Sequence, residues 1–360
     1  MSRMRSVLVA RLDGLGDVLL AGPAIRAVAA GLDRGTELVL LCGPEGAPAA
    51  RMLPGVDRVA VWSCPWILRD APPADGMALA SLREALGEKL PDEAVILTSF
   101  HQSPLPLALA LRLFGVGRIT GASVDFAGSL LDVRLRPGED FSEDLPEPER
   151  ALAIAGAAGY RLPADDSGRL AVNAPAEASA LTGSGPYLVI HPGATAPART
   201  WPASHAREAV RLLAERGHRV LVTGGPGERE LTAQVAGEHG IDLGGLAGMD
   251  ELAGILAGAR LLISGNTGPA HLAAAVGTPV VSLFSPVVPA VRWAPYGVPV
   301  ELLGRQDAPC RGSRAVQCPV PGHPCLASVS PEEVLEACER LLDREDETGR
   351  RARPRERTAS

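Results

Sequence analysis

A carboxylate at position 17 stands where an acid–base group could act on a substrate. It closes the segment 11–17, RLDGLGD, which directly follows a short apolar strand at 6–10. Ligands of parallel α/β sheets bind beyond the carboxyl ends of strands, where loops meet helix N-termini. Asp17 could therefore remove a proton from a substrate hydroxyl, or it could serve only as an N-cap or first-turn carboxylate of the helix that it opens. Three neighbours, two of them glycines that permit a tight turn, are expected to support this site: Arg11, Gly14 and Gly16.

A second segment has the residue types that bind anions. It follows a strand at 187–191 and reads PGATAPARTWP over 192–202. Thr195 and backbone N–H groups could donate hydrogen bonds to a phosphate, and Arg199 would add a fixed positive charge in a forked geometry. The alternative is an ordinary strand-to-helix turn with a surface arginine and a packing tryptophan.

A third turn, TGGPGERE at 223–230, also lies between a strand and a helix. Its Glu228 could accept hydrogen bonds from ribose hydroxyls, as acidic residues do in dinucleotide-binding folds. It could equally be a carboxylate that stabilises the first turn of the helix. The sequence leaves both roles open.

The fourth turn, ISGNTGPAHLA at 263–273, is the most informative. An apolar strand ends in polar and glycine residues, and a helix then begins near a proline. The backbone N–H groups of Thr267, Gly268 and Ala270, with the Thr267 hydroxyl, could hold a pyrophosphate. Asn266 belongs to the same turn. His271 is a secondary candidate, because a lone histidine near a helix start is usually structural.

These four turns predict that the two halves of the chain have different binding roles. Three turns in the C-terminal half suit phosphate and ribose, whereas one turn in the N-terminal half presents a carboxylate. A nucleotide-bearing donor held by one domain would then meet, in a cleft, an acceptor that the other domain deprotonates.

The elements that must position these turns alternate along the chain. Continuous apolar strands separated by helices are typical of parallel sheets covered on both faces. The expected strands are 6–10, 37–42, 58–62, 94–99, 187–191, 218–223, 260–264 and 279–284. The expected helices are 17–32, 203–216, 229–238, 250–258, 268–276 and 331–343.

The same pattern predicts two domains. A chain of 360 residues exceeds what one hydrophobic core usually organises. Proline, glycine and acidic residues cluster over 163–186, where we place the joint. We expect an N-terminal domain at 1–170, a C-terminal domain at 171–343 and a disordered tail at 344–360. A further acidic stretch, 137–148, is expected to be an exposed loop.

Composition excludes several classes of protein. Hydrophobic residues make up 46% and charged residues 21%, as in soluble globular proteins. A net charge of −7 argues against a nucleic-acid partner held by phosphate contacts. The apolar runs are too short to span a membrane, and six cysteines are too few for a disulfide scaffold. With no signal peptide recognised before the first strand, we expect a cytoplasmic protein.

Several stretches, taken in order, resemble glycosyltransferase family 9, whose best-known members are the ADP-heptose:lipopolysaccharide heptosyltransferases. The resemblance spans roughly residues 5 to 340 and rests on the order of the motifs rather than on any one of them. The stretches are 9–19, 191–194 with Arg199 and 201–202, 223–226, and 267–271 with 277–280.

The resemblance implies a GT-B architecture, in which two Rossmann-like domains with parallel sheets face one another across a cleft. The N-terminal domain would bind the acceptor and the C-terminal domain the nucleotide sugar. The family's catalytic carboxylate occupies the position of Asp17, its phosphate-binding cation matches Arg199, and its ribose-binding acid matches Glu228. Its phosphate-binding turn matches 266–271, although many members carry Asp where Asn266 stands here.

An inverting glycosyl transfer follows from this resemblance. A sugar, a heptose or a related one, would move from a nucleoside-diphosphate sugar, most simply an ADP-linked one, to a hydroxyl of a glycan, lipid-linked or small-molecule acceptor. Asp17 would take the proton of that hydroxyl. Arg199, Thr195 and Thr267, with the helix start after Gly268, would stabilise the departing diphosphate. No Asp-x-Asp pair is present, so we expect transfer without a metal or other cofactor.

Four residues within sixteen positions raise the question of zinc: Cys310, Cys318, His323 and Cys325. Their spacings are not those of a zinc ribbon or finger, so we interpret the cluster as structural, with zinc left as the alternative. Two other functions also stay open, a GT-B sugar-nucleotide epimerase and a non-catalytic nucleotide-sugar-binding protein. Release of nucleoside diphosphate on addition of an acceptor would separate transfer from both.

Overall fold

The computed structural model describes residues 5–68, 70, 71 and 73–352, and the side chains of these residues as far as 344. The described chain divides into two compact units between Ala174 and Pro175. Unit 1 contains residues 5–174, and the short segment Val291–Gly297 belongs to it as well; unit 2 contains residues 175–290 and 298–352. We call Val291–Gly297 the returning segment.

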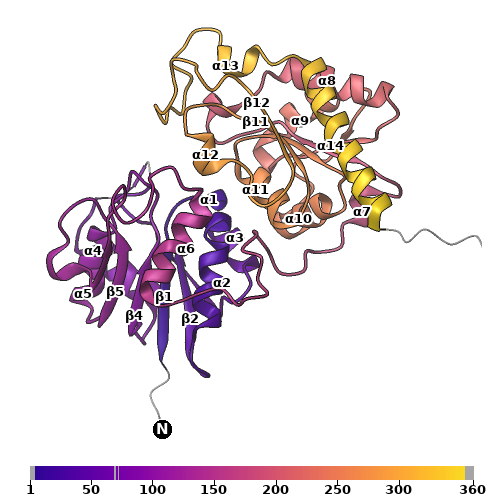
Figure 1. Ribbon diagram of the computed structural model, residues 1–360. Coiled ribbons are helices and arrows are strands. Elements are labelled where there is room, and N and C mark those ends of the chain that lie inside the picture. Colours follow the sequence, from indigo (N-terminus) through magenta and orange to yellow (C-terminus); the bar gives the residue numbers. More distant parts are fainter. Residues whose placement is uncertain (1–4, 69, 72, 353–360) are drawn as a thin grey trace, which may run out of the picture. The chain divides into compact units, whose positions relative to one another are not determined.

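Unit 1 is built on a parallel sheet of six strands in the order β3-β2-β1-β4-β5-β6 (Figure 1). The strands are β1 Ser6–Arg11, β2 Glu37–Cys42, β3 Arg58–Val61, β4 Glu93–Ile96, β5 Arg118–Ala122 and β6 Val133–Leu135. All six residues of β1 are buried, which explains why this strand reads as a continuous apolar run rather than as an alternating one.

Helices cover both faces of this sheet. Because side chains alternate across a strand, Leu8 and Ala10 of β1 face the core shared with α4 and α5, whereas α1, α2, α3 and α6 pack with one another on the opposite face (Figure 1). The helices are α1 Leu15–Leu20, α2 Gly22–Ala30, α3 Ala47–Met52, α4 Gly76–Leu86, α5 Leu105–Leu113, η1 Gly128–Leu130 and α6 Glu147–Ala158. The short helix α12, Ala290–Trp293, leads into the returning segment.

Unit 2 repeats the plan with the order β12-β11-β10-β7-β8-β9, again with parallel pairing. Its strands are β7 Leu188–His191, β8 Val220–Val222, β9 Ile241–Asp242, β10 Leu262–Gly265, β11 Val280–Leu283 and β12 Val300–Leu303. Both orders are the 3-2-1-4-5-6 arrangement of Rossmann folds.

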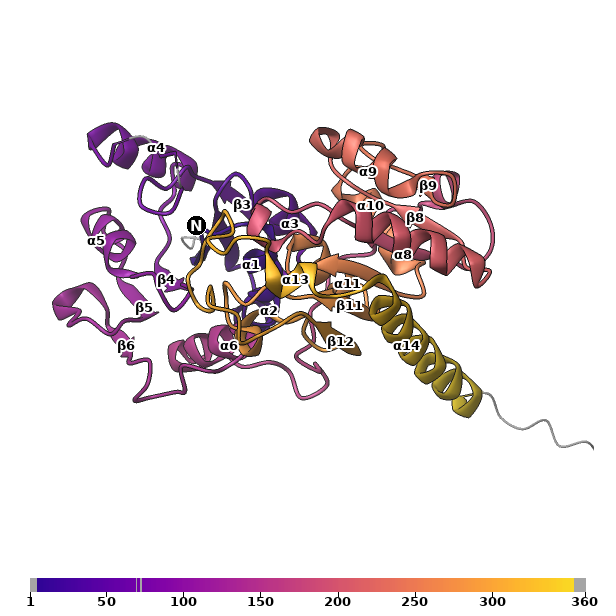
Figure 2. The same cartoon turned by 90° about the horizontal axis from the view of Figure 1, so that it is seen from above.

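Three helices of unit 2 share one core with the sheet, and α8 lies beside α14 in both views (Figures 1 and 2). These helices are α8 Ala203–Glu215, α9 Arg229–Ala236 and α14 Pro331–Ala352. The remaining elements are α7 Ser179–Thr182, η2 Pro197–Arg199, η3 Pro226–Glu228, α10 Met249–Ala257, α11 Gly268–Ala275 and α13 Pro324–Ala327.

The structure confirms the α/β class but differs from the expectation for two segments that were expected to be irregular. Helix α14 continues through 344–352, which we expected to be disordered, whereas 353–360 lie outside the described residues. The acidic stretch 137–148 is not exposed throughout, because α6 begins at Glu147, which is only 2% exposed.

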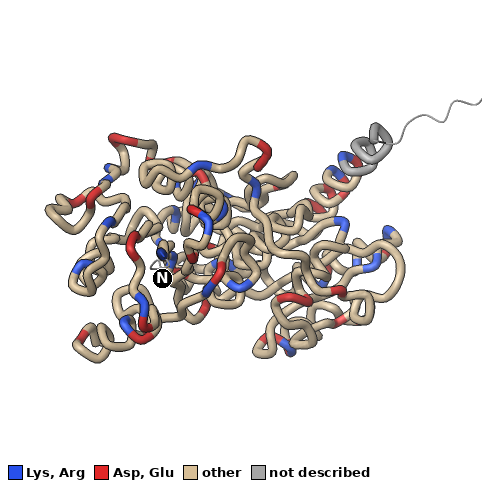
Figure 3. Tube along the Cα trace, turned by 90° about the horizontal axis from the view of Figure 1, so that it is seen from below, with Lys and Arg blue, Asp and Glu red and all other residues tan. Residues whose placement is uncertain are grey.

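Charges of both signs are interspersed along the chain (Figure 3), in keeping with a modest net charge of −7. Among the helices of the described residues, none is both long enough and apolar enough to cross a membrane.

Candidate active site

The carboxyl ends of β1 and β4 meet at the point where the strand order of unit 1 reverses, which is where Rossmann folds bind ligands. β1 ends in Arg11, which is 2% exposed. After a tight turn, α1 begins with Gly14 as its N-cap residue, and Gly16 and Asp17 lie in its first turn. Asp17 is therefore not the N-cap of this helix. The structural alternative that remains is a carboxylate in the first turn of the helix.

A single buried guanidinium gathers three carboxylates at this point. Arg11 Nη2 lies 2.9 Å from Asp17 Oδ1 and 3.1 Å from Glu147 Oε2, and its Nε lies 2.9 Å from Asp13 Oδ2. The same Nη2 is 2.8 Å from the hydroxyl of Ser99, which follows β4. The Asp13 carboxylate also accepts a hydrogen bond from the side chain of Gln102.

Three negative charges around one positive charge leave the cluster short of cations. Burial, opposed by Arg11, raises the pKa of Asp13 to about 6. Burial likewise raises the pKa of Glu147, again against the attraction of Arg11. Desolvation disfavours an ionised carboxyl, so these two buried groups take protons more readily than Asp and Glu in water.

Asp17 is the carboxylate of this cluster that reaches solvent most, with a side chain 27% exposed against 10% for Asp13 and 1% for Glu147. Its Oδ1 accepts hydrogen bonds from Arg11 Nη2 and, at 3.2 Å, from Nε1 of Trp293 in the returning segment. Within the described residues, Oδ2 accepts no hydrogen bond. One oxygen is thus held in place and the other is left for a ligand.

In unit 2, the loops after β7 and β10 meet at the corresponding reversal of strand order. Arg199 ends the short helix η2, and its Nη1 donates to the backbone oxygen of Asn266 at 3.4 Å. A Cβ added at Gly265 would lie 2.5 Å from the backbone oxygen of Arg199. Only a glycine at 265 permits this approach, which brings two predicted phosphate-binding turns together.

The turn after β10 leaves fewer backbone N–H groups for a pyrophosphate than we expected. Thr267 N donates to Gly265 O at 2.9 Å, and Ala270 N donates to Thr267 O at 3.2 Å. Of the three amides predicted to bind pyrophosphate, only that of Gly268 donates to no other described residue. Gly268 is also the first residue of α11, so this N–H points from a helix N-terminus, where anions are favoured.

Some side chains around this turn are buried and shape it, whereas the hydroxyls of others could bind a ligand. The amide of Asn266 is buried and pairs in both directions with the backbone of Ser285, at 3.3 Å each. His271 is 5% exposed. The Thr267 hydroxyl makes no cap hydrogen bond and lies 3.4 Å from Ser264 Oγ. Thr195 is exposed in the bend after β7.

Glu228 caps the start of its own short helix η3, as the structural alternative for this residue expected, and its carboxylate also faces the loop after β7. Its Oε2 accepts from Gly225 N at 2.7 Å and lies 3.8 Å from Nε2 of His191. A Cβ at Gly193 would lie 1.8 Å from Glu228 Oε1. Burial lowers the pKa of His191, with Glu228 acting in the opposite direction, and His191 Nδ1 lies 3.0 Å from the hydroxyl of Thr223.

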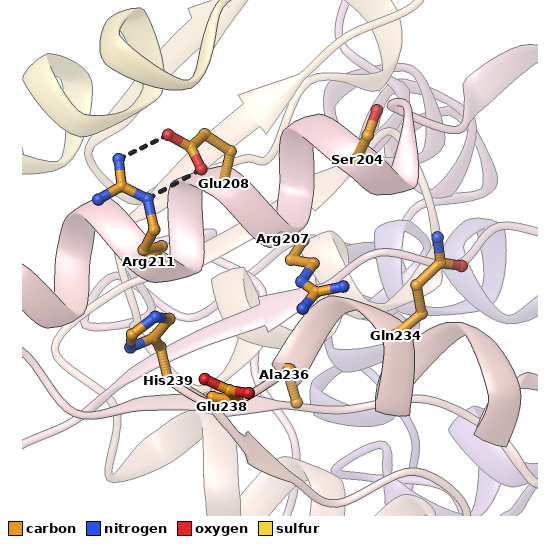
Figure 4. Close-up of a pocket in the computed structure, with 9 residues that line it drawn as sticks. Ser204, Arg207, Glu208, Arg211, Gln234, Ala236, Glu238 and His239 are labelled. Carbon is orange, nitrogen blue, oxygen red and sulfur yellow. Dashed lines mark hydrogen bonds and ion pairs between the residues drawn. The ribbon is translucent and has the colours of Figure 1, made fainter.

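A separate cavity of about 260 Å³ opens beside α8 and α9 and is not lined by any predicted site residue. Figure 4 shows Arg211 on α8, paired with Glu208 at 2.6 Å, across from His239. Arg211 is paired with Glu208 and Glu215, and no predicted site residue lines this cavity, so we assign it no ligand.

The cysteine cluster belongs to the hydrophobic core of unit 2. Cys310 and Cys325 are buried there, and Cys318 packs against them. Burial raises the pKa of the Cys325 thiol, as expected for an inert structural cysteine. Across the described residues, no three His, Cys, Asp or Glu side chains are arranged to hold a metal ion.

Sequence reasoning missed three residues that the fold brings to these turns: Glu147, His191 and Trp293. Glu147 lies 136 positions from Arg11 and Trp293 lies 276 positions from Asp17, so local patterns carry no trace of either contact. His191 was visible as the polar end of a buried strand, a signal that could have marked it.

Comparisons with known proteins concern the family and the fold of this chain. The sequence pattern of glycosyltransferase family 9 (heptosyltransferase) matches residues 102–322. Lipopolysaccharide heptosyltransferase 1 of Pseudomonas aeruginosa is 35% identical over 162 residues, which are 44% of this chain and 41% of that protein. The match to its namesake in Escherichia coli K12 covers 34% of that protein. The chain therefore spans less than half the length of these curated relatives.

Solved structures share the fold along nearly the whole chain. A family 9 glycosyltransferase of Veillonella parvula superposes with a TM-score of 0.76 at 18% identity and covers 96% of this chain and 99% of that one. The Escherichia coli heptosyltransferase WaaC, solved with ADP, gives 0.69 at 22% identity, with 93% and 99% covered. These likenesses confirm the GT-B fold. Because the family pattern also covers more than half of its length, the chain belongs to glycosyltransferase family 9.

Proposed function

We propose that this protein is an inverting glycosyltransferase. It moves a heptose or a related sugar from a nucleoside-diphosphate sugar, with ADP-heptose as the first donor to test, to a hydroxyl of a glycan, lipid-linked or small-molecule acceptor. Membership of family 9 supports transferase chemistry. The relatives named as lipopolysaccharide heptosyltransferases favour a heptose donor and a cell-surface glycan acceptor.

The observation that carries the proposal is the pattern of hydrogen bonds and the exposure of the Asp17 carboxylate. Two donors hold Oδ1, while Oδ2 accepts nothing within the described residues and the side chain is partly exposed. A carboxylate held in this way can take the proton of an acceptor hydroxyl as that oxygen attacks the anomeric carbon. Attack opposite the leaving diphosphate inverts the configuration at that carbon.

Arg11 holds this carboxylate in place. Its guanidinium nitrogen Nη2 lies 2.9 Å from Asp17 Oδ1. The buried neighbours Asp13 and Glu147, which contact the same guanidinium, have raised pKa values. Asp17 is the most exposed of the three and is therefore the carboxylate that an acceptor hydroxyl can reach.

The leaving diphosphate is stabilised by fixed groups of unit 2. Arg199 provides the cation, the Gly268 N–H and the start of α11 provide a helix dipole, and the hydroxyls of Thr267 and Thr195 provide donors. Asn266 pairs with the backbone of Ser285 and so holds the turn in shape, and His271 is buried at the start of α11. Donors fixed in advance need no reorganisation as charge develops on the phosphate. We therefore propose that transfer requires no divalent ion.

Glu228 is the proposed ribose acceptor. Its carboxylate is held at the carboxyl ends of β7 and β8 by the Gly225 N–H, beside the loop that carries Arg199. Accepting hydrogen bonds from two adjacent hydroxyls is the role of an acidic residue in this place in Rossmann folds. Its side chain is 30% exposed, so a ligand can reach it.

The test is Asp17→Asn, assayed as release of ADP from ADP-heptose in the presence of acceptor, with GDP-, UDP- and dTDP-sugars alongside. Loss of a general base lowers turnover by on the order of a hundredfold or more, while the melting temperature stays close to that of the wild type. Glu332→Gln, which changes a first-turn carboxylate of α14, is the control for helix-dipole effects. Turnover of Asp17→Asn at the wild-type rate would remove Asp17 from catalysis, and no acceptor-dependent release from any donor would refute glycosyl transfer.

A further inference from the structure

The returning segment is held in unit 1 by specific polar and aromatic contacts. Arg292 is only 8% exposed, its guanidinium carbon lies 4.2 Å from the centre of the Phe100 ring, and its Nη2 lies 3.3 Å from Glu143 Oε2. Tyr296 donates its hydroxyl to Glu149 Oε1 at 3.2 Å. A buried arginine stacked on an aromatic ring and paired with a carboxylate is a rigid anchor.

This anchor sets the position of one indole. The Trp293 ring packs against Phe100, with ring centres 5.6 Å apart, and its Nε1 donates to Asp17 Oδ1 at 3.2 Å. Phe100 follows β4 and also contacts Arg292, so the aromatic pair and the anchor share one support. The N–H that faces the carboxylate therefore comes from a segment fixed on both sides.

We infer that Trp293 is a positioning residue for Asp17, and this inference rests on the proposed function of Asp17 as the general base. Arg11 and Trp293 approach the same oxygen from two parts of the chain. One donor alone leaves the carboxylate free to rotate about its side-chain bonds. Two donors on Oδ1 fix the direction of Oδ2, which is the oxygen that receives the proton of the acceptor.

The N–H also affects the charge of the base. A hydrogen bond donated to a carboxylate favours its ionised form. The charged groups gathered at Asp17 are Arg11 on β1, whose guanidinium contacts it, and Asp13 and Glu147, whose carboxylates contact the same guanidinium. The indole N–H of Trp293 is the second donor to the Asp17 carboxylate.

Trp293→Phe tests this role, because phenylalanine keeps an aromatic ring against Phe100 and removes only the N–H. We expect kcat to fall by on the order of tenfold, the cost of a hydrogen bond to a charged group, with KM for the donor unchanged. The acid limb of the pH–rate profile should move to higher pH, since the base then loses a donor that favoured its ionised form.

Trp62→Phe is the matched control. Trp62 is a buried tryptophan of the same unit whose Nε1 donates to Ala78 O and Ser81 Oγ. Its replacement should lower the melting temperature and leave the pH–rate profile in place. If Trp293→Phe retains wild-type kcat and the wild-type profile, or if its only effect is a lower melting temperature like that of Trp62→Phe, the inference is wrong.

A second measurement uses the unaltered Trp293. The chain has four tryptophans, so its nitrogen–proton spectrum contains four indole signals, and Phe variants of the other three identify that of Trp293 by elimination. This signal should titrate with the same midpoint as the acid limb of the rate profile, and the titration should vanish in Asp17→Asn. An indole signal that is indifferent to Asp17→Asn overturns the inference even if Trp293→Phe does not fold.

Failure of this inference can be told apart from failure of the proposed function. Full activity in Asp17→Asn would remove the general base itself. A large loss in Asp17→Asn together with wild-type behaviour of Trp293→Phe would leave the base in place and refute only its positioning by Trp293.

Discussion

At the scale of single residues, the charge balance around Arg11 is the most unusual feature of the molecule. Arg11 is buried with Asp13, Asp17 and Glu147 within 3.1 Å of its nitrogens. One guanidinium cannot fully compensate three carboxylates, two of which are almost completely removed from water. The imbalance appears as raised pKa values of Asp13 and Glu147. The cluster should therefore make the folding stability of the protein depend on pH.

Asp13→Asn should change how stability depends on pH. Asp13 has a pKa of about 6 in the folded chain against a reference value of 3.8, so its unfolded form releases the proton first. As pH rises through both values, this group removes on the order of 3 kcal/mol of folding stability from the wild type, about 2 kcal/mol of it between pH 4 and 6. Asparagine cannot titrate and mimics the neutral form, so the variant avoids this loss.

The measurement is the free energy of unfolding of both proteins at several pH values from 4 to 7. The difference between them should grow in favour of Asp13→Asn up to pH 6 and then level off. The contribution of Glu147 is present in both proteins and cancels. Parallel curves would show that Asp13 titrates normally in the folded chain.

Arg199→Ala should weaken binding of the phosphate groups and leave binding of the nucleoside almost unchanged. A charge-assisted hydrogen bond to phosphate is lost, so affinity for ADP should fall by roughly tenfold or more, whereas affinity for adenosine should change little. Calorimetry with both ligands measures this, and Arg305→Ala, an exposed arginine of the same unit, is the control. Equal losses for ADP and adenosine would assign Arg199 a structural role.

At the scale of elements, the sequence predicts strands with a continuous apolar run and misses strands that lack one. The eight expected strands correspond to eight of the twelve in the described chain. Four were missed: β5, which contains a glycine; β6, only half-buried; β9, two exposed residues; and β12, a half-buried strand at the sheet edge. None of these four presents the continuous apolar run by which a buried parallel strand is recognised.

For the loops between elements, the sequence predicted the position of each loop but not its hydrogen bonds. Asp17 and the turns at 191–202, 223–230 and 263–273 were recognised because each directly follows a predicted strand. Which atoms they present was not predictable. The amides of Thr267 and Ala270 are used within their own turn, and Glu228 turns toward the neighbouring strand's loop. These details depend on backbone hydrogen bonds that no local pattern of residue types encodes.

Gly193→Ala should weaken nucleoside binding at small cost in stability. The added Cβ would lie 1.8 Å from Glu228 Oε1, so the end of a flexible side chain must move away. If Glu228 binds ribose, affinity for adenosine and for ADP should fall alike, by roughly as much as in Glu228→Ala, unlike the effect of Arg199→Ala. Binding by calorimetry and the melting temperature are the measurements.

Gly227→Ala is the control, because a Cβ there meets nothing within 4 Å and Gly227 lies in the same short helix as Glu228. Unchanged adenosine affinity in Gly193→Ala, with the carboxylate displaced, would show that Glu228 does not contact the nucleoside.

At the scale of the whole molecule, the repeated alternation of strands and helices was enough to predict two domains built on parallel sheets. It could not reveal that the chain passes between them more than once. The division lies between Ala174 and Pro175, and Val291–Gly297 then belongs to unit 1 although the chain on either side of it belongs to unit 2. A seven-residue excursion has no periodicity of its own, and it is recognised only by the contacts of Arg292 and Trp293.

Activity of the whole protein should survive excess EDTA. The proposed phosphate-binding groups are a fixed cation, hydroxyls and a helix start, which stabilise developing charge without an ion. Initial rates and the melting temperature should both be measured with and without the chelator. Loss of turnover at constant melting temperature, restored by Mg²⁺ or Mn²⁺, would show that the metal-free mechanism is wrong.

The returning segment also has a consequence for exchanging parts between relatives. A hybrid enzyme made by a single junction near residue 174 would inherit residues 291–297 with its C-terminal half. Its N-terminal unit would then receive Trp293, and with it one of the two donors on Asp17, from the other parent. Unit 2 thus cannot be exchanged as one continuous block without also exchanging a hydrogen-bond donor to Asp17. A hybrid that keeps its own residues 291–297 needs three junctions, at 174, 290 and 297.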